Sequence, residues 1–266
     1  MFGIIENVLR PHSGIAGSEG ILKLHREALR SREEIMKVDF GTGRMGESAV
    51  GSEVRRNRTE SQHGRDRQSA NDSEIVASEY PIRVKQLAGR STLPLRRAQQ
   101  LHRLAKFTGA EQILELGTSL GFTTAWLALA LPTGGKIISL EGCPETLKLA
   151  ERNIRRLGLE DRITLMRGRF EETLSQALEQ MPRPDMVFID GNHRREPTLN
   201  YFTQCLDKAH ERTIIVIDDI HHSAEMEAAW EEIKAHSAVR VSIDLFRMGL
   251  IFLREGLSTQ HFILRY

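Results

Sequence analysis

Three aspartates stand at the ends of two apolar runs. Asp190 ends the run VFID, and Asp218 and Asp219 end the run IVIDD. If these runs are neighbouring parallel strands, they lie about 4.8 Å apart and their carboxylates meet at one edge of the sheet. Three carboxylates at one edge repel each other unless a cation or protons intervene, and oxygen ligands with room for water are typical of Mg²⁺. The pattern predicts a divalent-metal site formed by these three residues.

His193 follows Asp190 by three residues, in the segment DGNHRREP. An imidazole has an ordinary pKa of about 6.5, so it can accept a proton at neutral pH. We therefore predict Asp190 and His193 as catalytic residues, although Asn192 and His193 could instead cap a helix that starts near Glu196. Asp190 is the firmer prediction, because a carboxylate at the end of a buried strand is costly without a partner.

His221 and His222 directly follow the aspartate pair. They could line a substrate pocket or act as alternative metal ligands. More often, such residues only lead into the next helix, whose expected N-cap is Ser223.

A glycine turn follows the apolar run ILEL, in the sequence ILELGTSLGFTT. Gly117 and Gly121 allow the chain to turn sharply and let a ligand approach the backbone. The turn lacks the G-x-G-x-x-G pattern of dinucleotide folds, because Ser119 stands where the middle glycine would be. Glu115 precedes the turn, and its carboxylate disfavours phosphate and suits a cationic ligand. Such a turn alone is weak support for a binding site.

Glu141 ends the next apolar run, 24 residues after Gly117. A carboxylate at the end of a second parallel strand can accept two hydrogen bonds from a ribose diol. The alternative is that Glu141 only caps the helix expected to start at Pro144. The glycine turn at the right separation favours ribose binding.

The elements that would position these residues follow from hydrophobic periodicity. A helix is expected over about 94–108. Apolar runs at 112–116, 136–140, 163–166, 185–189 and 213–217 then alternate with helical patterns at about 121–131, 144–157, 171–180, 196–209 and 223–236. Such alternation predicts a parallel sheet covered on both faces. The runs 239–246 and 249–253 predict an antiparallel hairpin, and the final QHFILRY predicts a further edge strand or a docked tail. The predicted fold is α/β, a doubly wound and mostly parallel seven-stranded sheet.

The N-terminal third differs in composition from the rest. Residues 1–40 are interpreted as a helical segment, with one amphipathic helix over about 19–37. Residues 41–80 are poor in apolar side chains and rich in Gly, Ser, Arg and acids, which predicts a disordered linker. The main domain is expected over 81–266.

The overall composition excludes several classes of protein. With 37 Lys+Arg against 36 Asp+Glu, the chain has no basic excess for nucleic acid. Two cysteines cannot form a disulfide framework. The longest apolar stretch, over 122–131, is shorter than the roughly 20 residues of a membrane span. We expect a cytoplasmic protein that binds a small molecule, and homodimerisation is compatible with this fold.

The motifs ELGTSLG, LEGCP, FIDGNH and IVIDDIH resemble those of class I S-adenosylmethionine-dependent methyltransferases. Over about 94–266 the chain is most similar to the catechol and caffeoyl-CoA O-methyltransferase branch. The resemblance implies S-adenosyl-L-methionine as cofactor. It also implies a set of cofactor-binding residues: Glu115, Gly117, Thr118, Ser119, Gly121, Glu141, Gly142, Gly168 and Phe170.

The same resemblance implies that Asp190, Asp218 and Asp219 hold Mg²⁺ or another divalent cation. Asp219 replaces the Asn that is common at its position in that branch, and His193 replaces a lysine base. The segment MRGRFEETL departs from the frequent G-D-x pattern, with Arg169 where a small or acidic residue often meets adenine.

The predicted activity is therefore O-methylation of a small-molecule hydroxyl, with a bound cation that chelates the acceptor and lowers its pKa. Chelation would favour a vicinal diol. Two alternatives stay open: a metal-independent N- or O-methyltransferase, and a non-catalytic cofactor-binding or scaffold protein. A nicotinamide oxidoreductase is disfavoured, because the phosphate-binding glycine pattern is absent.

Overall fold

The computed structural model describes residues 8, 14–39 and 77–265. In this part of the chain, eight strands form one sheet in the order β10-β8-β9-β7-β6-β3-β4-β5. The strands are β3 (Gln112–Leu116), β4 (Lys136–Glu141), β5 (Ile163–Arg167), β6 (Met186–Ile189), β7 (Ile214–Asp218), β8 (Val241–Asp244), β9 (Met248–Phe252) and β10 (Gln260–Ile263). The doubly wound α/β fold and the antiparallel β8–β9 hairpin are thus confirmed.

The sheet has one strand more than the seven predicted. Residues 260–263 of the C-terminal run form β10, which pairs in parallel with β8 at the edge of the sheet. The backbone of β8 is thereby hydrogen-bonded on both sides, to β9 and to β10. Of the two alternatives left open for the C-terminal run, the edge strand is the one observed.

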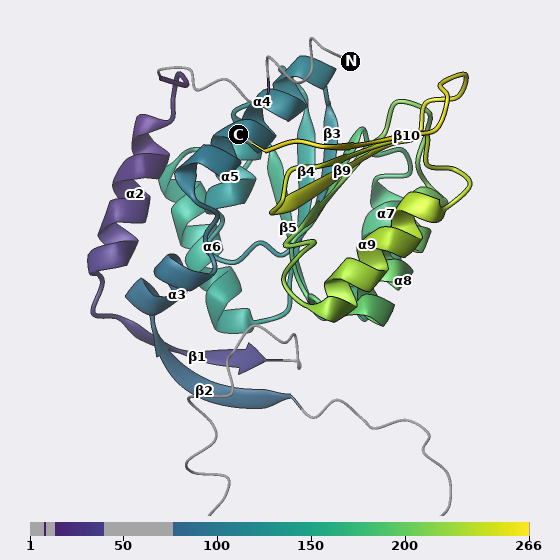
Figure 1. The fold of residues 1–266 in the computed structure, drawn as a ribbon. Coiled ribbons are helices and arrows are strands. Elements are labelled where there is room, and N and C mark those ends of the chain that lie inside the picture. Colours follow the sequence, from purple (N-terminus) through teal and green to yellow (C-terminus); the bar gives the residue numbers. More distant parts are fainter. Residues whose placement is uncertain (1–7, 9–13, 40–76, 266) are drawn as a thin grey trace, which may run out of the picture.

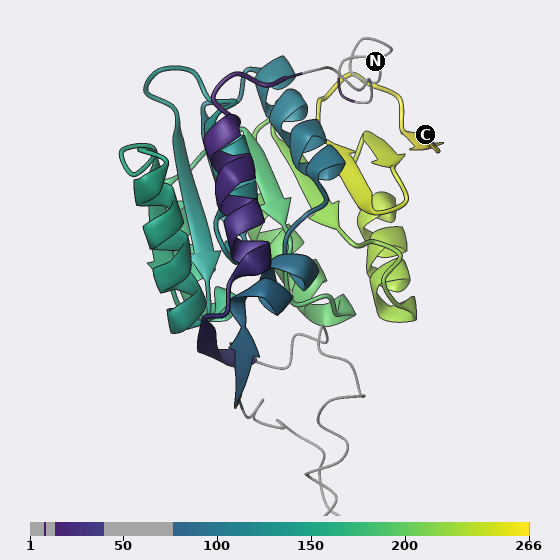
Figure 2. The same ribbon diagram turned by 90° about the vertical axis from the view of Figure 1, so that its left-hand side faces the viewer.

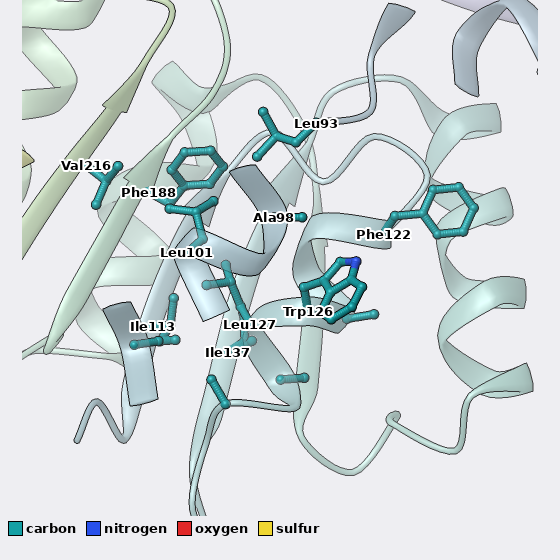
Figure 3. Packing of buried hydrophobic residues seen from close by; sticks show 14 of the residues in the cluster. Leu93, Ala98, Leu101, Ile113, Phe122, Trp126, Leu127, Ile137, Phe188 and Val216 are labelled. Carbon is teal, nitrogen blue, oxygen red and sulfur yellow. The ribbon is translucent and has the colours of Figure 1, made fainter. Parts of the chain in front are cut away.

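Helices cover both faces of the sheet (Figure 1). One face carries α4 (Leu95–Thr108), α5 (Phe122–Ala128) and α6 (Pro144–Arg156), and the other carries α7 (Phe170–Gln180), α8 (Arg195–Leu206) and α9 (Ala224–Ala235). Each strand supplies alternate side chains to the two faces. Ile113 of β3 belongs to the core on the α4 side, and Leu114 to the core on the α7 side. Figure 3 shows Ile113 near Leu101 of α4 and Leu127 of α5.

The N-terminal segment packs on the α4–α6 side of the sheet (Figure 2). It consists of α2 (Glu19–Arg30) and β1 (Glu34–Asp39), and after residue 77 the chain continues as β2 (Ser78–Arg83) and α3 (Val84–Arg90). Ile21 and Leu24 of α2 are buried in the core on that side. The hairpin of β1 and β2 is antiparallel, with Ile35 opposite Ile82.

The helix predicted over 19–37 is wrong in its last part. It ends at Arg30, and Ser31 already has an extended backbone. Residues 34–39 form a strand because β2 offers a pairing edge, which overrides their local helical spacing. Most of the predicted 41–80 linker, residues 41–76, lies outside the described residues, and residues 78–80 belong to β2. Within the described ranges, no helix is long and apolar enough to cross a membrane.

Candidate active site

A cavity of about 290 Å³ opens at the carboxyl ends of β3, β4 and β6. Its second wall comes from β1, β2 and α3, so the N-terminal hairpin faces the sheet across the cavity. Many of the predicted site residues line it: Gly117, Ser119, Glu141, Gly142, Phe170, Asp190 and His193. The location matches the rule that open α/β sheets bind ligands beyond the carboxyl ends of their strands.

The turn after β3 is held by close contact with β6. Gly117 has a φ of +110°, and a Cβ atom there would lie 2.1 Å from the backbone oxygen of Asp190. Its amide donates a hydrogen bond of 3.0 Å to the Leu140 carbonyl. Ser119 also has a left-handed backbone, with a φ of +49°. The turn therefore brings the backbone of β3 against the Asp190 loop, and only glycine fits at position 117.

Glu141 is anchored at both carboxylate oxygens. Oε2 accepts a hydrogen bond of 2.9 Å from the Ser119 amide, and Oε1 accepts one of 2.9 Å from the Cys143 amide. Each oxygen retains a lone pair, so the carboxylate can still accept hydrogen bonds from a ligand. The buried hydroxyl of Ser119 has no hydrogen-bond partner among the described residues. A fixed acceptor pair and an unsatisfied hydroxyl at one cavity wall fit the ribose and polar groups of the predicted cofactor.

Glu115 is placed differently from the prediction of a direct cofactor contact. Its side chain is completely buried and does not line the cavity. It accepts hydrogen bonds from the hydroxyls of Thr124 on α5 and Ser139 on β4. Burial raises the pKa of Glu115 to about 8, against the opposing effect of these two hydrogen bonds. Glu115 thus links α5 to the sheet beneath the glycine turn.

Three further predicted cofactor residues, Thr118, Gly121 and Gly168, also lie off the cavity surface. Thr118 shares a hydrogen bond of 2.6 Å with Ser139, and Gly121 is the N-cap of α5. Gly168 follows β5, and its amide donates to the Glu141 carbonyl at 3.1 Å. They shape the backbone that carries the lining residues.

Asp190 and His193 come together at the cavity. His193 Nε2 lies 3.6 Å from Asp190 Oδ1, and the imidazole is almost completely buried. The N-cap of α8 is Arg194, which makes no side-chain capping bond. Among the described contacts, neither Asn192 nor His193 therefore caps that helix, so the structural alternative for His193 is not observed.

A buried network supports the loop that carries His193. Asn192 has a backbone φ of +51°, and its side-chain nitrogen Nδ2 donates a hydrogen bond of 2.9 Å to Tyr201 Oη. The Tyr201 hydroxyl in turn donates to the carboxylate of Glu171, which lines the cavity. Burial raises the pKa of Tyr201 well above its ordinary value, so it remains a neutral donor at physiological pH.

The two aspartates at the end of β7, Asp218 and Asp219, are held by arginines. Arg97 Nη1, on α4, lies 3.1 Å from Asp218 Oδ1 and 3.8 Å from Asp219 Oδ1. Arg247 Nη1 also lies 3.8 Å from Asp219 Oδ1. Asp218 is completely buried, and neither aspartate lines the cavity that Asp190 lines.

Within the described ranges, no three His, Cys, Asp or Glu side chains form a group that could hold a metal ion. The residues present do not fit the predicted divalent cation. His221 is also engaged elsewhere, because its Nε2 lies 2.8 Å from Asp244 Oδ2. The His222 ring centroid lies 5.7 Å from that of His193.

Sequence analysis missed the wall of the cavity that comes from the N-terminal hairpin. Lys37, Val38 and Asp39 of β1 line the cavity together with Tyr80 of β2 and Arg90 of α3. The Val38 amide donates to Cys143 Sγ at 3.4 Å, which joins the hairpin to the loop after Glu141. The only indication of a strand in the sequence of β1 was its two β-branched residues, Ile35 and Val38, within a charged segment.

Comparisons with known proteins point in one direction. A family model described as a methyltransferase domain matches residues 114–220. The catechol O-methyltransferase of Niastella koreensis is 38% identical over 121 residues, which cover 45% of this chain and 54% of that protein. The catechol O-methyltransferase of Mycobacterium tuberculosis is 31% identical over 176 residues, which cover 64% of this chain and 78% of that protein. The chain thus spans about half of the first relative and more than three quarters of the second.

Solved structures of similar fold agree with these matches. Cofactor-bound Rv0187 from MTB superposes with a TM-score of 0.56 at 26% identity, over 63% of this chain and 84% of that one. The O-methyltransferase of Bacillus cereus in complex with SAH gives a TM-score of 0.54 at 24% identity, over 61% and 83% of the two chains.

Proposed function

The chain belongs to the catechol O-methyltransferase family of S-adenosylmethionine-dependent methyltransferases, and from this premise we propose the reaction of its cavity. The protein transfers the methyl group of S-adenosylmethionine to a hydroxyl oxygen of a small molecule. The observation that carries the proposal is Glu141, whose carboxylate is fixed by two backbone amides at the cavity wall, beside the Gly117 turn.

The cofactor would be held between the sheet and the N-terminal hairpin. Glu141 would accept the ribose hydroxyls, and the Ser119 hydroxyl and the open backbone at Gly117 would meet the methionine part. Phe170 would offer an apolar ring to the adenine, at the start of α7. The site is rich in carboxylates, which suits a ligand with a sulfonium and no phosphate.

His193 is the proposed general base. When bound, the cofactor supplies a methyl group on a positively charged sulfur. His193 Nε2 would take the proton from the acceptor hydroxyl, and Asp190, 3.6 Å away, would stabilise the imidazolium that results. The walls of the cavity would hold the acceptor oxygen in line with the methyl group, so that positioning supplies much of the rate.

The divalent cation predicted at Asp190, Asp218 and Asp219 stays a prediction, and no step is derived through it because the described residues do not fit it. Cytoplasmic location and homodimerisation likewise stay predictions from the sequence, and light scattering after size exclusion tests the second.

Isothermal titration of S-adenosylmethionine into the purified protein tests the cofactor site. We expect binding by the native chain and an affinity loss of at least about tenfold in Glu141→Ala, which removes a charge-assisted hydrogen-bond acceptor. Glu145→Ala is the matched control, because Glu145 is only four residues away and pairs with Lys148 at the surface. Absence of binding by the native chain would contradict the proposal.

The same titration separates binding from chemistry in His193→Ala. Cofactor affinity should stay within a small factor of native, while methyl transfer to a panel of hydroxylated aromatic acceptors falls by about 10²–10⁴. A variant that methylates at the native rate would rule out His193 as the base.

A further inference from the structure

We propose that the guanidinium of Arg97 takes the place of a divalent metal ion at Asp218 and Asp219, so that this chain works without a metal. The positions of Arg97, Asp218 and Asp219 support the first part, that the guanidinium lowers the affinity of the two carboxylates for a metal ion. The second part, catalysis without a metal, also rests on the proposed function.

Arg97 is positioned by its helix. It lies in the first turn of α4, next to Ala98, which is buried in the core with Leu101 (Figure 3). The guanidinium reaches across to the end of β7 and donates to both carboxylate oxygens of Asp218, at 3.1 and 3.4 Å. Its side chain is 19% exposed, and that of Asp218 is completely buried.

The charges at this end of β7 are already compensated. Asp218 faces Arg97, and Asp219 lies 3.8 Å from both Arg97 and Arg247. The third carboxylate, Asp190, lines the cavity, where its Oδ1 lies 3.6 Å from His193 Nε2. Two guanidiniums thus provide, at the two carboxylates of Asp218 and Asp219, the positive charge that a dication would otherwise supply.

An arginine also resists displacement by a metal ion. A guanidinium keeps its proton under all conditions in which the protein is folded, so it cannot become neutral to make room for a second positive charge. A Mg²⁺ ion at these carboxylates would stand beside two guanidiniums, and it would give up tightly held water to get there. Asp218 is completely buried and does not line the cavity, so its carboxylate is not open to an ion that shares the cavity with the acceptor.

The acceptor class follows from this arrangement. Chelation by a metal requires two neighbouring oxygens on the acceptor, whereas a base and a positioned methyl group require only one. We therefore expect acceptors with an isolated hydroxyl to be methylated as readily as those with a vicinal diol.

Manganese binding, followed by the EPR signal of free Mn²⁺, tests the inference without any turnover. The native protein should leave the signal unchanged. Arg97→Gln should take up Mn²⁺ at least about tenfold more tightly, because a positive charge a few ångströms from the carboxylates is gone. The double variant Arg97→Gln with Asp218→Asn should lose this increase in Mn²⁺ affinity. Arg96→Gln, an exposed neighbour on the same turn, is the matched control and should behave as native.

Activity is measured in parallel with and without EDTA. Native methyl transfer should be unchanged by complete chelation. The inference would be overturned by stoichiometric Mn²⁺ uptake by the native chain or by loss of its activity in EDTA. It would also be overturned by a folded Arg97→Gln variant whose Mn²⁺ affinity is no higher than native. If Arg97→Gln fails to fold, as judged by circular dichroism, the native protein alone decides. If no acceptor is methylated, the proposed function fails, while the Mn²⁺ titrations still decide the role of Arg97.

Discussion

At the scale of single residues, the strand-end carboxyl groups differ in environment although they look alike in sequence. Glu141 lies at the cavity with its charge held by amides, whereas Glu115 is buried among hydroxyls. Position along the strands explains the difference, because Glu115 lies opposite Ser139 under α4 and α5, whereas Glu141 is two residues further along the same face, at the end of β4. Both carboxylates could be found from the sequence, but their separate environments depend on the register of β3 against β4, which sets how far along the sheet each one lies.

Glu115 should make stability depend on pH. Its pKa is 4.5 ordinarily and about 8 in the folded protein, so the folded state binds more protons than the unfolded state between these values. Its contribution is fully present below the ordinary pKa and is lost as pH rises through about 8. Urea unfolding from pH 5 to 9 should show native stability falling relative to Glu115→Gln by an amount on the order of 1–4 kcal/mol.

Glu145→Gln provides the control for the pH series, since Glu145 is partly exposed on α6. It should follow the native curve. Parallel curves for the native protein and Glu115→Gln would mean that Glu115 ionises as freely in the folded state as in the unfolded one.

At the scale of elements, the turn at Gly117 packs the end of β3 closely against Asp190, the residue after β6. Gly117→Ala would place a methyl group 2.1 Å from the Asp190 carbonyl oxygen and keep a backbone φ of +110°. Gly134→Ala is the matched control, because Gly134 also has a positive φ, +88°, but open space around its Cβ position.

Urea unfolding should therefore separate a clash from backbone strain. We expect Gly134→Ala to cost about 1 kcal/mol of unfolding free energy, and Gly117→Ala to cost about 3 kcal/mol or more, since the overlap adds to the strain. Equal losses would show that β3 and β6 can separate without penalty.

Elements also differ in how well the sequence predicts them. The five central strands are continuous apolar runs, because parallel strands are buried on both faces, and they were predicted within one or two residues. β1 was missed because its stability comes from β2, some forty residues later in the chain, rather than from its own composition. The contacts of Arg97 could not be predicted from the sequence either, because α4 and β7 are far apart along the chain and meet only in the folded protein.

At the scale of the whole molecule, the N-terminal segment packs against the same core as the helices beside the cavity. Ile21 of α2 is 1% exposed and packs in the same core as α4 and α5. The segment also makes surface ion pairs with α6, such as Glu27 with Arg156 at 2.7 Å.

Two substitutions should rank these contributions. Ile21→Ala should lower the free energy of unfolding by about 2–4 kcal/mol, because it leaves a void in the core. Glu27→Ala should change it by less than about 1 kcal/mol, because both partners are exposed to solvent. A native-like denaturation curve for Ile21→Ala would mean that α2 unfolds separately from the sheet.

The two walls of the cavity have a consequence for how this protein can evolve. The methyltransferase-domain family model matches residues 114–220, whereas the facing wall comes from residues 37–39 and from positions within 80–91. Substitutions at the cavity-lining positions of the hairpin can therefore alter the shape of the cavity while the sequence around Glu141 and His193 stays the same. Under the proposed function, related proteins could come to differ in their acceptors through changes in this short piece of chain, as long as those changes leave the cofactor bound.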